Sequence, residues 1–119
     1  MREYKGIILY NAGPAKDESA WQEIFVEVDW NSLWLSLCIG ADAGWVARAR
    51  PVILYSESLF VAGVKAGGIN DQIRIYISDK RSRDSFSHEW LHSYLFLAKD
   101  YPAGDIFHAD PLWKTCGFI

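Results

Sequence analysis

The chain has few of the residues on which disulfide-rich secreted domains and many redox proteins depend. Its 119 residues include only two cysteines, Cys38 and Cys116, which are far apart in the sequence. Two cysteines allow one disulfide at most, so a framework of several bridges is excluded, and there is no CxxC pair. Reduced thiols are therefore the expected state.

Long apolar runs and strong positive charge are also lacking. No stretch approaches the roughly 20 apolar residues that cross a bilayer, and residues 1–10 are too polar for a signal peptide. Lys and Arg number 12 against 15 Asp and Glu, and the densest basic stretch, residues 80–83, is short. A nucleic-acid-binding domain usually presents a larger basic face. We expect a cytoplasmic protein that binds neither membranes nor nucleic acids, and the sequence does not indicate its oligomeric state.

Several well-defined motifs are missing as well. The sequence contains no GxGxxG, no P-loop and no serine in a nucleophile elbow, and it lacks the His-x-Glu and Pro-Cys-x-x-Cys of the zinc deaminases. However, half of the residues are hydrophobic and 15% are aromatic, which is ample for a folded core. Residues 1–119 are therefore predicted to form a single domain.

Two long helices are predicted from hydrophobic periodicity. After Asp17, apolar residues recur at helical spacing and continue to residue 39, although residues 24–29 also alternate as a strand would; we favour the helix. The second helix begins at Asp84 or Ser85, either of which can cap it, and runs to residue 98. Because this second helix is apolar on nearly every side, we expect it to be buried between other elements.

Short β-branched and aromatic runs predict the strands. They fall at residues 7–10, within 45–55, at 59–64 and at 72–78, with a turn at 67–71. The predicted fold is α+β, with a small, mainly antiparallel sheet of three or four strands packed on the N-terminal helix and the buried second helix.

All three histidines lie near the C-terminus, and two of them form an HExxH sequence, His88-Glu89-Trp90-Leu91-His92. Residues four apart on a helix share one face, so His88 and His92 can converge on one zinc ion. Glu89, at the edge of that face, would reach a zinc-bound water and act as the general base. Burying two imidazoles on an apolar helix without partners would be unfavourable, and metal ligation resolves this conflict.

His108 is the preferred third ligand, because it lies beyond the turn that ends the second helix and can point back at it. Asp105 is the runner-up, followed by Asp100 and Asp110, and Cys116 is a remote alternative. Asp110 is also predicted to cap a last short helix over residues 111–116, or to hold the other ring nitrogen of His108.

Residues 88–92, placed after a predicted strand and before a distal ligand, resemble the zinc-binding motif of the zincin metallopeptidases. Residues 108–113, His-Ala-Asp-Pro-Leu-Trp, resemble the third-histidine segment of SprT-like and related small zincins, in which a histidine precedes a short helix carrying an aromatic residue. The resemblance covers about residues 72–114. It implies that zinc is held by His88, His92 and His108, and that Glu89 is the general acid and base.

The chain also departs from some zincin patterns. Metzincins would have glycine at Leu95 and histidine at Ala98, and no glutamate follows Glu89 to serve as the downstream ligand of gluzincins. The resemblance further implies that an edge strand binds the substrate as an added antiparallel strand, and residues 72–78 are the candidate.

The sequence therefore predicts a zinc-dependent hydrolase, and among hydrolases a peptidase, with a peptide or protein substrate. In one alternative, zinc only ties the HExxH helix to the C-terminal segment; in another, the protein is a metal-free interaction module. Glu89 favours the hydrolase, because a structural zinc site needs no carboxylate there. Tyr94, Tyr101 and Arg83 are candidate donors to a transition-state oxyanion.

Overall fold

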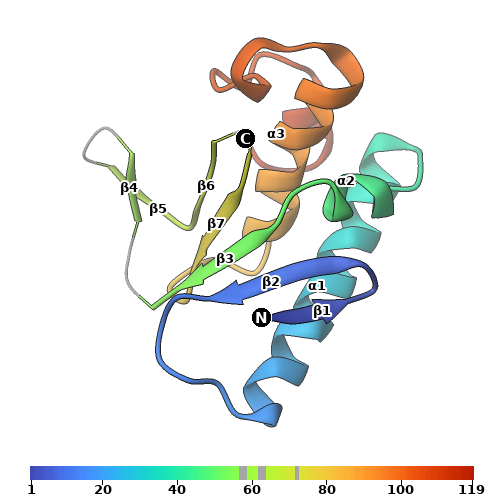
Figure 1. Cartoon of the computed structure of the whole chain (residues 1–119). Helices are drawn as coiled ribbons and strands as arrows, with labels where there is room; N and C mark the ends of the chain where they lie inside the picture. Colours follow the sequence, from blue (N-terminus) through green and yellow to red (C-terminus); the bar gives the residue numbers. More distant parts are fainter. Residues whose placement is uncertain (57–58, 62–63, 72) are drawn as a thin grey trace.

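The computed structural model describes residues 1–56, 59–61, 64–71 and 73–119. They form an α+β fold, which confirms the predicted class (Figure 1). In chain order the elements are β1 (Arg2–Tyr4), β2 (Ile7–Asn11), α1 (Glu18–Ile39), α2 (Gly44–Arg48), β3 (Val52–Tyr55), β4 (Leu59–Val61), β5 (Val64–Ala66), β6 (Gly68–Asn70), β7 (Ile75–Ser78), α3 (Ser85–Lys99), the 3-10 turn η1 (Pro102–Gly104) and α4 (Leu112–Thr115).

The main sheet has five strands in the order β1-β2-β3-β7-β6, and β4 and β5 form a separate hairpin. Strands β2, β3 and β7 are parallel to one another, and only the outer pairs, β1 with β2 and β6 with β7, are antiparallel. The prediction of a mainly antiparallel sheet of three or four strands was therefore wrong. The chain between β2 and β3 contains α1 and α2, and a helical crossover of this kind returns the next strand in the same direction.

One face of the sheet is buried and the other is partly open. Leu9, Val52 and Ile75 are neighbours across β2, β3 and β7, and all three are fully buried. The alternate residues, such as Tyr10 and Tyr76, retain exposure. This alternation shows that helices cover only one face. Helices α1 and α3 lie side by side and join that face in a single core (Figure 1).

Helix α1 confirms the helical reading of the N-terminal periodicity. The Asp17 side chain accepts a hydrogen bond from the backbone N–H of Ala20, and the helix is capped at its C-terminus by Gly40, whose φ of 72° is left-handed. The strand predicted within residues 45–55 is present only in the second part of that range. Gly44–Arg48 form α2 instead, and β3 begins at Val52.

The segment before the HExxH helix differs most from expectation. The predicted turn at residues 67–71 contains β6, and β6 rather than β7 is the edge strand. The candidate edge strand at residues 72–78 is thus interior over Ile75–Ser78, and Gln72 lies outside the described residues. Residues 62 and 63 of the strand predicted at 59–64 lie outside the described residues too, and the remainder contributes to β4 and β5.

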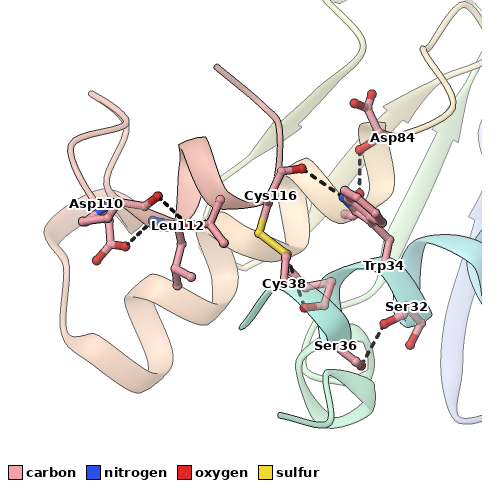
Figure 2. The surroundings of a disulfide bond; sticks show 12 residues. Ser32, Trp34, Ser36, Cys38, Asp84, Asp110, Leu112 and Cys116 are labelled. Atoms are coloured by element: carbon pink, nitrogen blue, oxygen red, sulfur yellow. Dashed lines mark hydrogen bonds between the residues drawn. A yellow bond between two sulfur atoms is a disulfide. The ribbon is translucent and has the colours of Figure 1, made fainter. Parts of the chain in front are cut away.

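The two cysteines are joined, so the expectation of reduced thiols was wrong. A disulfide connects Cys38, near the end of α1, to Cys116, which follows α4 (Figure 2). The indole N–H of Trp34 donates to the Cys116 carbonyl and reinforces the connection. The C-terminal segment is thereby fastened to α1. Within the described residues, no helix has both the length and the apolar character needed to cross a membrane.

Candidate metal centre

The start of α3 is fixed by α1. Asn31, which is fully buried on α1, accepts the backbone N–H of Ser87 at 2.9 Å and donates to the Arg83 carbonyl at 2.8 Å. The Asp84 side chain does not cap α3 as expected. The backbone carbonyl of Asp84 accepts a hydrogen bond from the Ser87 hydroxyl instead. Helix α3 therefore presents His88, Glu89 and His92 from a frame held by its neighbour.

The chain turns back on α3 immediately after the helix ends. The carbonyl of Gly104 lies 2.6 Å from Nδ1 of His92. Because a carbonyl can only accept, Nδ1 carries the ring proton and Nε2 of His92 is unprotonated, with its lone pair directed away from Gly104. A carbonyl on the second ring nitrogen is the usual support of a metal-ligating histidine.

Asp105, the runner-up ligand, organises this returning segment instead. Its carboxylate accepts the backbone N–H groups of Ala109 and Asp110 and the indole N–H of Trp113 at 2.8–3.1 Å. Its carbonyl accepts the N–H of His108 at 2.9 Å. These bonds hold His108 at a φ of 55°, a left-handed conformation that is rare for a residue other than glycine.

The remaining alternatives for the third ligand also have other roles. Asp110 accepts the backbone N–H of Leu112 and the hydroxyl of Tyr101, so it stabilises the start of α4 and does not contact the His108 ring. Cys116 is in the disulfide. Asp100 is exposed at the end of α3.

The three imidazoles converge. Each offers one ring nitrogen, and these nitrogens all lie within 4.8 Å of one another; the cluster found among the described residues contains no other side chain. Nε2 of His92 and Nε2 of His108 are 3.3 Å apart. Two nitrogens bound tetrahedrally at 2.0–2.1 Å from one zinc ion would be about 3.3–3.4 Å apart. The residues therefore fit a divalent metal with three imidazole ligands.

Trp113 packs against the three histidines, and the sequence did not indicate this role. It is fully buried, and its ring centroid lies 4.1 Å from that of His108, 4.4 Å from His92 and 4.9 Å from His88. Nothing in the sequence signals that an aromatic residue at this position contacts three histidines.

Burial favours the uncharged form of the three histidines. Desolvation lowers the pKa of His88 to about 4, and the neighbouring imidazoles lower it further than Asp84 raises it. Desolvation likewise lowers the pKa of His92 to about 4, against the opposing effect of the Gly104 carbonyl, and lowers that of His108. Neutral imidazoles are the form that binds a metal.

Glu89 is buried beside this cluster, and burial raises the pKa of its carboxyl group to about 8. Desolvation is the one cause of this shift, and no hydrogen bond from a described residue to the carboxyl group is found. A buried acid without a donor is unfavourable for stability, and such groups are concentrated at functional sites.

A cavity of about 270 Å³ brings these groups together. Glu89 and all three histidines line it, with β6 on the opposite side. A Cβ atom at Gly68 would lie 2.8 Å from Cγ of Glu89, so glycine allows β6 to approach the helix this closely. The Asn70 side chain donates to the Glu89 carbonyl and to the Ser93 hydroxyl, which ties β6 to α3.

The predicted oxyanion donors are not in the cavities found around Glu89. Tyr101 donates to Asp110, the Arg83 guanidinium lies over the ring of Trp30, and Tyr94 packs near Trp45.

The centre is thus built from His88, Glu89, His92 and His108, supported by Trp113 and Asp105. Comparison of the chain with protein-family models, curated proteins and solved structures gave no match.

Proposed function

We propose that the protein is a zinc-dependent hydrolase of peptide bonds, with zinc held by His88, His92 and His108 and with Glu89 as the general base. One observation carries this proposal: a buried carboxyl group that lacks a hydrogen-bond donor among the described residues shares a cavity with three converging imidazoles, whose uncharged form burial favours. This is the set of groups that metal-assisted hydrolysis requires.

Each group has a defined task. Zinc, when bound, supplies Lewis acidity, which lowers the pKa of a coordinated water and polarises the carbonyl of an amide. His92 offers Nε2, because its Nδ1 proton faces Gly104. The positive charge of the metal favours the ionised form of Glu89. The carboxylate then accepts a proton from the attacking water and returns it to the leaving amine.

A purely structural zinc is less well supported. The disulfide already fastens the C-terminal segment to α1, so the molecule does not need a metal for that connection. A structural site also gains nothing from a buried carboxyl group beside it, because that group must be desolvated.

Strand β6 is the candidate substrate-binding strand in place of residues 72–78. It is the edge of the main sheet and lines the cavity, so its outer main-chain groups can pair with an extended peptide. The disulfide also favours an oxidising compartment over the cytoplasm expected from the sequence.

Elemental analysis and a matched acid variant test the proposal. We expect about one zinc per chain in the wild type and loss of zinc from H88A, H92A and H108A, since removing a ligand weakens a three-histidine site strongly. Glu89→Gln should retain zinc but lose hydrolysis of reduced, unfolded casein by about a hundredfold or more. Glu23→Gln, at an exposed position of α1, is the control.

Two results would contradict the assignment. Zinc retention in H108A would remove His108 from the site. Equal turnover by the wild type and Glu89→Gln would remove the glutamate from the reaction.

A further inference from the structure

A second cavity, of about 240 Å³, lies on the other side of Glu89 from the first. The two cavities share Gly68, His88 and Glu89. The second cavity extends to residues 82–85 at the start of α3, whereas the first cavity extends to His92 within the helix. The second cavity also reaches Gly67, just before β6, and the first cavity reaches Asn70 at the end of β6. A chain bound across Glu89 would therefore place one side chain in each cavity.

The second cavity has a polar wall that contains an available carboxylate. Asp84 accepts the Ser82 hydroxyl on one oxygen, makes no side-chain cap of α3 and has no ion-pair partner among the described residues. The two nearest arginines in the sequence are engaged elsewhere, because Arg81 pairs with Glu27 and Arg83 lies over Trp30. The remaining acceptor capacity of Asp84 faces the cavity and suits a cationic side chain.

The first cavity has an apolar wall beyond the histidines. Ile69 from β6, and Ala103 and Ile106 from the returning segment, line it. Ile106 is 57% exposed, and its side chain would lose contact with water if an apolar side chain covered it.

We propose that the substrate is a polypeptide with a lysine or arginine on one side of the bond to be cut and an aliphatic or aromatic residue on the other. Asp84 selects the basic residue and Ile106 the apolar one. This inference rests on the proposed function and adds the substrate class to it.

The test uses the zinc-loaded protein and a randomised peptide library whose cleavage sites are identified by mass spectrometry. Basic residues should be enriched on one side of the cut and apolar residues on the other. For matched peptides carrying lysine or alanine at the basic position, we expect kcat/KM to differ about tenfold. In Asp84→Asn that ratio should fall to about one. Ile106→Ser should reduce only the apolar preference, and Asp100→Asn, at an exposed acid outside both cavities, should change neither.

Binding separates this inference from the hydrolase assignment. Zinc-loaded Glu89→Gln should bind the lysine peptide about tenfold more tightly than the alanine peptide by fluorescence anisotropy, and adding Asp84→Asn should remove the difference. Equal binding of the two peptides, or cleavage without a basic preference, overturns the inference. Selective binding of the lysine peptide without cleavage by the wild type would support the inferred selectivity and contradict the hydrolase assignment.

Discussion

Trp113 and Asp105 show how a residue that binds no metal can determine whether a metal site exists. Trp113 packs against all three imidazoles, and its indole N–H is held by the Asp105 carboxylate. The same carboxylate fixes the backbone that carries His108. Ring position and loop conformation thus depend on one buried acid, which makes Asp105 a positioning residue.

We therefore expect Asp105→Ala to weaken zinc binding without removing a ligand. Loss of the bonds to Ala109, Asp110 and Trp113 should release His108 from its left-handed conformation and raise the Kd for zinc about 10- to 100-fold. Competition with a chromophoric chelator measures the change. Asp100→Ala is the control, and a wild-type Kd in Asp105→Ala would show that the loop is held by other contacts.

The sequence pattern predicted the three clustered histidines better than the residues that hold them in place. His88 and His92 follow from helical spacing alone, because positions four apart share a face. The sequence also favoured His108 over Asp105 as the third ligand, but it could not exclude Asp105, because the choice depends on how the returning segment folds. The roles of Trp113 and Gly68 depend on tertiary contacts, and nothing in local sequence marks them.

At the scale of elements, the long helices were predictable and the sheet was not. Helices α1 and α3 have local periodicity and local end signals. Strand β6 was read as a turn because its segment begins with Gly67 and Gly68, and its strand character arises from pairing with β7. Strand direction was also missed, because it depends on which strands meet after the α1–α2 crossover and leaves no local trace.

The disulfide connects two of these elements and is expected to stabilise both the fold and the centre. Its sequence separation of 78 residues implies a closed-loop contribution of about 4.5 kcal/mol to the free energy of unfolding. The Cys38→Ser/Cys116→Ser double variant should lose most of this in urea unfolding. It should also bind zinc more weakly, because Trp113 lies in the segment that the bond fastens.

A reducing agent provides the control for this prediction. It should lower the stability of the wild type to that of the double variant and leave the double variant unchanged. If two free thiols titrate in the oxidised wild type, the bond does not form and the prediction fails.

At the scale of the whole molecule, the buried histidines and Glu89 of the centre affect the stability of the metal-free protein, and their effects depend on pH in opposite directions. The histidines have folded-state pKa values of about 4 for His88 and His92, below their ordinary 6.5. Their contribution to stability is therefore present above pH 6.5 and is lost as the pH falls towards 4. Glu89 has a folded-state pKa of about 8 against 4.5. Its contribution is present below pH 4.5 and is lost as the pH rises to 8.

The metal-free protein should consequently be most stable near pH 6.5. Between pH 4.5 and 6.5 the unfolded chain binds more protons at the histidines than the folded chain retains at Glu89, so stability rises with pH. Between 6.5 and 8 the histidines of the unfolded chain lose their remaining protons and the effect of Glu89 dominates, so stability should fall by at most about 1.4 kcal/mol per pH unit. Urea unfolding in excess chelator at a series of pH values measures this profile. Glu89→Gln should abolish the fall above pH 6.5, whereas Glu23→Gln should retain it, and a wild-type profile that is flat from pH 6.5 to 8 would show that the Glu89 carboxyl group is already ionised in the folded state.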